Sequence, residues 1–142
     1  MKIIVLKFGG TSVGSIERIK KAVSIIQRYI KKKYKVIVVS SAMSGVTNDL
    51  IRKSQKLSRN FIASEYDVLV SSGEQISCAL ISGRLTHLGY NSRSWLGWQV
   101  PIITRGSHRN SFIDKVIPDK IINDFENKKI AVVAGFQGIS NE

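Results

Sequence analysis

The chain has 142 residues, of which 43% are hydrophobic and 23% charged, so it is long enough for one domain with a buried core and has an ordinary globular composition. Its 22 basic and 10 acidic residues give a net charge of +12, which raises the hypothesis of a polyanionic or phosphorylated ligand. The sequence has neither a signal-peptide core nor a run of roughly twenty apolar residues, so we expect a cytoplasmic protein with no membrane partner.

The first predicted strand covers residues 3–6 and leads through Gly9-Gly10 into an amphipathic helix that starts near Ile16. Glycines let backbone N–H groups approach a phosphate, and a helix N-terminus is electropositive. Lys7 adds a mobile positive charge at the same place. The glycines could equally make only a tight strand-to-helix connection, so both interpretations stay open here.

A β-branched run at residues 35–40 predicts a second strand, of the kind found inside a parallel sheet. It is followed at residues 41–48 by a loop of small and hydroxyl-bearing residues. We expect Thr47 or Asn48 to cap the next helix, because both side chains can accept a hydrogen bond from the first helical turn.

Residues 66–70, Tyr-Asp-Val-Leu-Val, lead into a helix predicted from about residue 73 to 87. Cys78, the single cysteine, excludes an internal disulfide and is expected to be a buried, inert thiol. Glu74 falls at the expected start of this helix. It could complement the helix dipole, or it could project into a cleft and hold an ammonium group; the residues alone favour the dipole role.

Short strands are predicted at residues 92–96 and 100–104, and a further helix from near Pro118. Trp95 and Trp98 are expected to fill core or interface volume.

The last strand is predicted at residues 130–134 and opens into a glycine-containing loop at 135–138. Alternating strands and helices predict an α/β fold, a three-layer sandwich with a mostly parallel central sheet. Since ligands collect at the carboxyl ends of parallel strands, the loops at Gly9-Gly10, 41–47 and 135–138 together predict a phosphate site.

Four segments resemble the N-terminal part of bacterial aspartokinases, which belong to the amino-acid kinase superfamily. They are Lys-Phe-Gly-Gly-Thr-Ser-Val at 7–13, Ser-Ala-Met-Ser-Gly-Val-Thr-Asn at 41–48, Ser-Ser-Gly-Glu-Gln-Ile-Ser at 71–77 and Val-Ala-Gly-Phe-Gln-Gly at 133–138. Residues 97–99 and 108–110 also match a family loop, although the family usually has glycine where Arg109 stands.

The resemblance implies ATP-dependent phosphorylation of the side-chain carboxylate of L-aspartate to 4-phospho-L-aspartate. This step leads to lysine, threonine, methionine and diaminopimelate. Magnesium would accompany the ATP and be held mainly by the nucleotide, with no protein metal cluster. The implied ATP phosphate site consists of Lys7, which would also be catalytic, Phe8, Gly9, Gly10 and Ser41; the implied substrate residues are Thr47 and Glu74.

The family continues with a threonine-rich turn, a Gly-Arg-Gly-Gly-Ser-Asp motif, adenine-binding strands and regulatory domains. We therefore expect residues 1–142 to be the N-terminal part of a kinase domain that is inactive alone. We also expect an open sheet edge at residues 130–134, with marginal stability or association into a homo-oligomer. Two other interpretations stay open: a non-catalytic remnant, or one piece of a split kinase that needs a complementing polypeptide. A basic nucleic-acid-binding module is disfavoured, because basic and aromatic residues are not interleaved.

Overall fold

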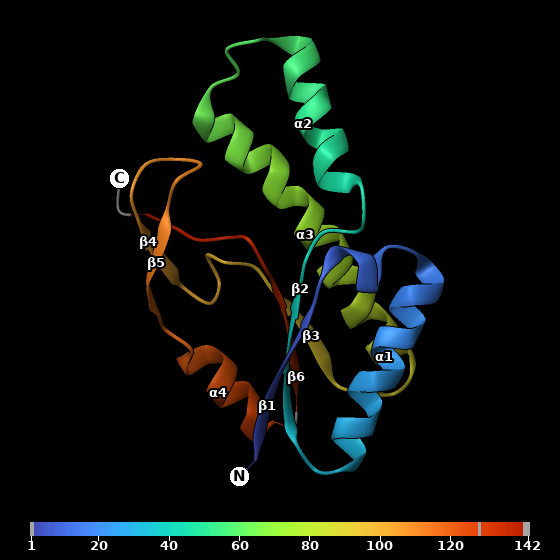
Figure 1. Ribbon diagram of the computed structural model, residues 1–142. Coiled ribbons are helices and arrows are strands. Elements are labelled where there is room, and N and C mark those ends of the chain that lie inside the picture. The colour runs from blue at the N-terminus through green and yellow to red at the C-terminus, as the bar shows by residue number, and fades with distance from the viewer. Residues whose placement is uncertain (1, 128, 141–142) are drawn as a thin grey trace.

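Strands and helices alternate along the computed structural model, which describes residues 2–127 and 129–140 (Figure 1). In chain order the elements are β1 (Ile3–Phe8), the 3-10 helix η1 (Gly10–Val13), α1 (Ile16–Lys31), β2 (Lys35–Ser40), α2 (Val46–Leu57), α3 (Ala63–His87), β3 (Ser92–Trp95), β4 (Ile102–Arg105), β5 (Phe112–Val116), α4 (Asp119–Glu126) and β6 (Ile130–Ala134).

The central sheet has four strands in the order β1-β2-β6-β3, and every neighbouring pair is parallel. This confirms the predicted α/β fold with a mostly parallel sheet. The prediction of an open edge at residues 130–134 is wrong, because β6 inserts between β2 and β3 and all five of its residues are buried. The two edges of the sheet are β1 and β3.

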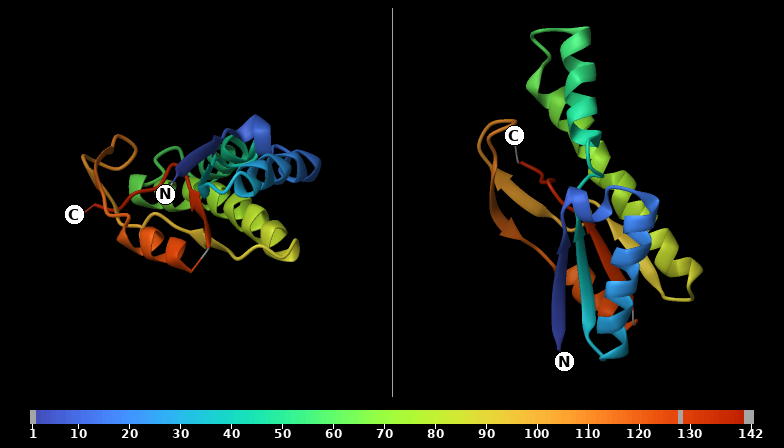
Figure 2. Two further views of the ribbon diagram at one scale, coloured as in Figure 1. Left: turned by 90° about the horizontal axis from the view of Figure 1, so that it is seen from below. Right: turned by 45° about the vertical axis from the view of Figure 1, so that its right-hand side comes forward.

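Helices α1 and α3 cover one face of this sheet and α4 covers the other, which makes three layers (Figures 1 and 2). On the α4 face, Ile121 and Phe125 pack against Ala131 and Val133 of β6. On the opposite face, Cys78 of α3 is fully buried and its thiol donates to the Val132 carbonyl at 2.9 Å. The prediction of a buried cysteine is confirmed, and this burial raises the pKa of the thiol.

Helix α3 begins at Ala63, ten residues before the predicted start at Gly73. Residues 66–70, predicted to lead into the helix, are themselves helical. Gly73 lies mid-helix, where a Cβ atom would come within 2.9 Å of the Ala42 Cβ. Glu74 is therefore three turns from the helix N-terminus, and the helix-dipole interpretation of this residue is wrong.

A small two-stranded antiparallel sheet, β4–β5, lies apart from the main sheet and packs near the first half of α3. The strand at 112–116 was not predicted. Helix α4 starts directly after Pro118, as predicted. Trp95 is buried as predicted, whereas Trp98 is 62% exposed and fills no core volume. No helix in the described part of the chain is long and apolar enough to cross a bilayer.

Candidate functional site

The loops that follow β1, β2 and β6 meet at one edge of the sheet, as predicted. The Ser41 N–H donates to the Phe8 carbonyl at 3.0 Å, which ties the second loop to the first. The Gly135 N–H donates to the Ser40 carbonyl at 2.9 Å, which ties the third loop to the second. These contacts follow from the parallel order of the three strands, since their carboxyl ends all point the same way.

The two glycines after β1 have different surroundings. A Cβ atom on Gly10 would lie 2.9 Å from the Ala42 carbonyl oxygen, so this position requires glycine for close packing of the first two loops. A Cβ atom on Gly9 would meet no atom within 4 Å. The backbone at Gly9 therefore faces open space, where an anion could approach it. Phe8, by contrast, places its side chain in the core.

Lys7 lies at the carboxyl end of β1, and its side chain is exposed. Residues 3, 5 and 7 occupy every second position of β1, so the Lys7 side chain lies on the same face of the sheet as Ile3 and Val5. The Phe8 side chain lies on the opposite face. Its ammonium group forms no hydrogen bond or ion pair with any described residue. The cation is therefore available to a ligand at the edge of the sheet.

Ser41 and Thr47 frame the loop after β2. The Ser41 carbonyl accepts a hydrogen bond from the Ser77 hydroxyl at 2.6 Å, which anchors the loop to α3. Helix α2 is capped by Gly45, with φ of +82°, and not by Thr47 or Asn48 as predicted. The cap at Gly45, in a left-handed conformation, stands two residues before Thr47, so Thr47 falls in the first turn of the helix. Thr47 is half-buried, and its hydroxyl bonds to no described residue.

Glu74 reaches from α3 to the same loop. Its side chain is buried, with 4% exposed, and Oε1 accepts a hydrogen bond from the Ala42 N–H at 3.2 Å. Oε2 is buried with no partner among the described residues. Burial raises the pKa of this carboxyl, and the Ala42 N–H opposes the shift only in part. An unpaired buried carboxylate oxygen is a natural acceptor for a ligand ammonium group.

A cavity of about 710 Å³ lies beside these residues, between the first half of α3, the β4–β5 hairpin and the loop after β6. Gln75, the neighbour of Glu74, lines it, as do Phe136, Gln137 and Gly138 of the loop predicted at 135–138. The other predicted site residues do not line it; they are Lys7, Phe8, Gly9, Gly10, Ser41, Thr47 and Glu74. The Gln137 side chain fixes one wall, because its amide donates to the Ser71 carbonyl at 2.9 Å and accepts from the Gly97 N–H at 3.0 Å. Sequence reasoning missed this cavity, since the hairpin that encloses it was not recognised.

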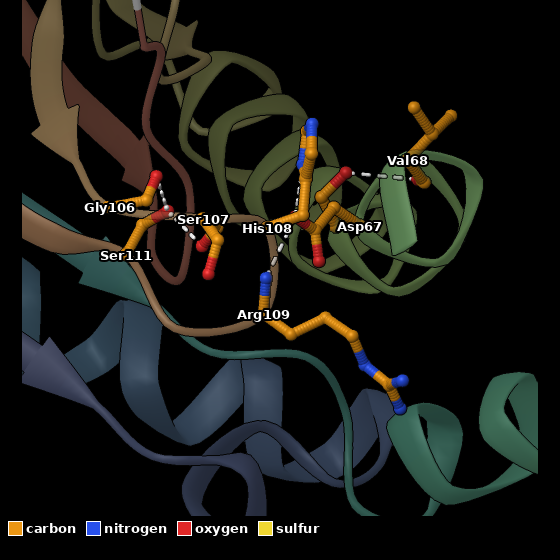
Figure 3. A network of polar contacts seen from close by, with 8 residues as sticks. Asp67, Val68, Gly106, Ser107, His108, Arg109 and Ser111 are labelled. Atoms are coloured by element: carbon orange, nitrogen blue, oxygen red, sulfur yellow. Dashed lines mark hydrogen bonds and ion pairs between the residues drawn. The ribbon is translucent and has the colours of Figure 1, made fainter. Parts of the chain in front are cut away.

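The tip of the hairpin is held onto α3 by a small polar network, shown in Figure 3. The Asp67 carboxylate pairs with His108 Nδ1 at 2.7 Å and accepts from the Arg109 N–H at 3.2 Å. The Arg109 guanidinium lies 4.1 Å from the centre of the Tyr66 ring. Arg109 has φ of +69°, a left-handed conformation that favours glycine.

Comparison with known proteins identifies the family of this chain. The sequence profile of the Amino acid kinase family matches residues 2–142. The chain belongs to the amino acid kinase family. The aspartokinase of Rickettsia conorii is 43% identical to it over 143 residues, which cover 99% of this chain and 36% of that relative.

Solved structures show a similar fold. Aspartate kinase from Synechocystis superposes with a TM-score of 0.81 at 39% identity, covering 96% of this chain and 22% of that one. E. coli aspartokinase III, solved with lysine and aspartate, has the same fold, with a TM-score of 0.81 at 19% identity over 99% of this chain and 42% of its own. The chain thus spans about a third of the length of the curated relatives that it matches.

Proposed function

We propose that this chain is the N-terminal part of an aspartate kinase, which transfers the γ-phosphoryl group of ATP to the side-chain carboxylate of L-aspartate. The observation that carries the proposal is the carboxyl edge of the sheet, where an open glycine turn, hydroxyl-bearing loops and an unpaired buried carboxylate come together. Relatives about 40% identical over nearly the whole chain are named aspartokinases, which supports this choice of substrate. The product, 4-phospho-L-aspartate, would feed the synthesis of lysine, threonine, methionine and diaminopimelate.

The proposed roles follow from the chemistry of phosphoryl transfer, in which the protein aligns two anions and neutralises their charge. Lys7 would stabilise the phosphoryl group, and the Gly9 and Gly10 backbone would approach the ATP phosphates. Magnesium, bound mainly by those phosphates, would neutralise further charge. Ser41 and Thr47 would bind nucleotide phosphate or substrate carboxylate through their hydroxyl groups.

Glu74 would recognise the α-ammonium group of aspartate through Oε2, while Oε1 stays on the Ala42 N–H. The hydrogen bond between the Ala42 N–H and Oε1 would hold the carboxylate in a fixed orientation before the substrate binds. A ligand ammonium would also remove the cost of burying an ionised oxygen without a partner.

We propose further that the 142 residues have little or no activity alone, since Lys7 is exposed to solvent on one side of the site and desolvation strengthens electrostatic catalysis. Binding, in contrast, is expected to be measurable at millimolar ligand.

Nuclear magnetic resonance tests the proposed site in the isolated chain. Titration with L-aspartate is expected to shift the amide signals of Ala42 and Glu74, whereas succinate, which lacks the ammonium group, leaves them in place. MgATP is expected to shift the Gly9 and Gly10 signals. Equal shifts with L-aspartate and succinate would contradict the role of Glu74, and unchanged glycine signals would contradict the phosphate site.

A further inference from the structure

A second cavity, of about 450 Å³, lies between β3, the loop after it and α4. Its volume falls within the range of small-molecule binding sites, and none of its lining residues belongs to the loops after β1, β2 and β6. Trp95 packs with α4 on one face of the sheet, and Arg93, two residues earlier in β3, shares that face. Trp98 lines the cavity from the loop, and Lys120 and Asp124 line it from α4.

Two cations in this cavity have no carboxylate partner among the described residues. The Arg93 guanidinium stacks on the Trp95 ring at 4.1 Å, and Lys120 lies one helical turn before Asp124 on α4. Neither cation forms an ion pair or a side-chain hydrogen bond with a described residue, and Asp124 pairs instead with Lys129 at 3.0 Å. Two free cations favour an anion, and a guanidinium can hold a phosphate through two parallel hydrogen bonds.

Two of the lining residues also carry a buried polar atom that has no partner in the described part of the chain. They are Trp95, whose Nε1–H is a donor, and Asp124, whose Oδ2 is an acceptor. Leaving such atoms unpaired costs free energy, which a ligand with a matching acceptor and donor would recover. The exposed Arg93 side chain lies over the Trp95 ring, so an anion that draws its guanidinium aside would open the way to the indole N–H.

The Trp98 ring supplies a flat apolar surface to the same cavity. It is 62% exposed and stacks on no other ring or cation of the described residues. An exposed indole beside cations can stack a nucleobase, since every base presents a π-face that a side-chain ring can cover. The exposure of Trp98, which core packing does not explain, therefore fits a role in stacking a planar ligand.

We propose that this cavity binds a nucleoside monophosphate. The phosphate would lie between Arg93 and Lys120 and accept a hydrogen bond from the Trp95 N–H. The base would stack on Trp98, and a ribose hydroxyl would donate to Asp124 Oδ2. A phosphate dianion balances the two cations, whereas inorganic phosphate leaves the indole bare and a neutral ring leaves both cations unpaired. This site is additional to the proposed kinase site and does not depend on it.

Tryptophan fluorescence tests the proposal, because both tryptophans of the chain line this cavity. Titration with AMP is expected to quench the emission and to saturate, whereas adenosine and inorganic phosphate give little change at the same concentrations. Arg93→Gln and Lys120→Gln should each weaken the apparent affinity for AMP by about tenfold or more. Lys21→Gln is the matched control, since it removes one exposed positive charge from α1 on the other face of the sheet and should leave the affinity unchanged.

Two variants place the bound AMP. Trp98 also lines the first cavity, but Lys120 lines only the second, so weaker binding by Lys120→Gln assigns the ligand to the second. Lys120 is exposed and touches neither tryptophan ring, so this variant decides the matter even where Arg93→Gln disturbs the stack on Trp95. Lys7→Ala, in the proposed phosphate site, is expected to leave the quenching as in the wild type, because that site contains no tryptophan.

Four results would overturn the proposal. They are no quenching by AMP, an equal response to adenosine or inorganic phosphate, an affinity that Lys21→Gln lowers as much as Lys120→Gln does, and quenching that Lys7→Ala abolishes and Lys120→Gln does not. The last result would place AMP at the proposed phosphate site. A chain that binds AMP as expected here, but whose Gly9 and Gly10 signals do not respond to MgATP, would contradict the proposed function and leave this inference standing.

Discussion

Glu74 and Ala42 share one hydrogen bond that defines the candidate site: the Ala42 N–H donates to Glu74 Oε1 at 3.2 Å, and Glu74 Oε2 stays buried without a partner among the described residues. The contact joins the middle of α3 to the loop after β2. It is reinforced by the Ser77 hydroxyl, one turn further along α3, which donates to the Ser41 carbonyl at 2.6 Å. Two motifs about thirty residues apart in the sequence thus meet at one carboxylate.

Glu74→Gln is expected to stabilise the unliganded chain at neutral pH. Burial raises the native pKa of this carboxyl above its ordinary value of 4.5, so ionisation is less favourable in the folded chain than in the unfolded one. Below about pH 4 the carboxyl is protonated in both states and the cost disappears. As the pH rises through 4.5 the unfolded chain ionises first, and wild-type stability falls until the pH passes the native pKa.

Urea unfolding between pH 4 and pH 8 measures this effect. The stability advantage of Glu74→Gln should grow with pH, while Glu126→Gln, at an exposed carboxylate of α4, should change little across the range. An advantage for Glu74→Gln that does not depend on pH would show that burial of the charge is not its cause.

Gly10→Ala is expected to destabilise the chain by about 1–3 kcal/mol, because the new Cβ would press against the Ala42 carbonyl oxygen. Gly9→Ala is the matched control. Its extended backbone and open surroundings should limit the change to about 1 kcal/mol or less. The free energy of unfolding of the two variants checks this difference, and equal destabilisation would contradict the close approach of the first two loops.

At Arg109, glycine is expected to be better tolerated than alanine. Both substitutions lose the contact of the guanidinium with Tyr66, but only glycine relieves the left-handed backbone, worth about 1 kcal/mol. Arg109→Gly should therefore unfold at higher urea concentration than Arg109→Ala. The reverse order would mean that the hairpin tip does not keep its positive φ.

Local patterns in the sequence predicted much of the fold. The β-branched residues at 35–40 favour a strand, and the glycines after β1 favour a turn. The residue types alone were therefore enough to predict these strands and the loops at their carboxyl ends. The start of α3 could not be predicted, because residues 68–70 are apolar and β-branched in part, and such a short apolar run does not by itself distinguish helix from strand. The place of β6 inside the sheet is likewise a property of strand order, which a strand's own residues do not encode.

In the candidate site, too, some features could be predicted from local residue types and others could not. The types of Lys7, Gly9 and Thr47 pointed to phosphate and carboxylate chemistry, and their clustering followed from parallel strands. The unpaired Glu74 oxygen and the adjacent cavity depend on long-range packing of α3 and the hairpin, which no local spacing reveals.

The most direct test of the proposed kinase site uses a chimera in which this chain replaces the matched part of the Rickettsia conorii aspartokinase. The measurement is the rate of L-aspartate-dependent ADP formation by this chimera. With ATP and magnesium, the chimera is expected to turn over, and Lys7→Ala should reduce the rate by about 10²–10³-fold while the protein still melts cooperatively. A folded chimera that forms no ADP with L-aspartate, or one whose rate is unchanged by Lys7→Ala, would contradict the account.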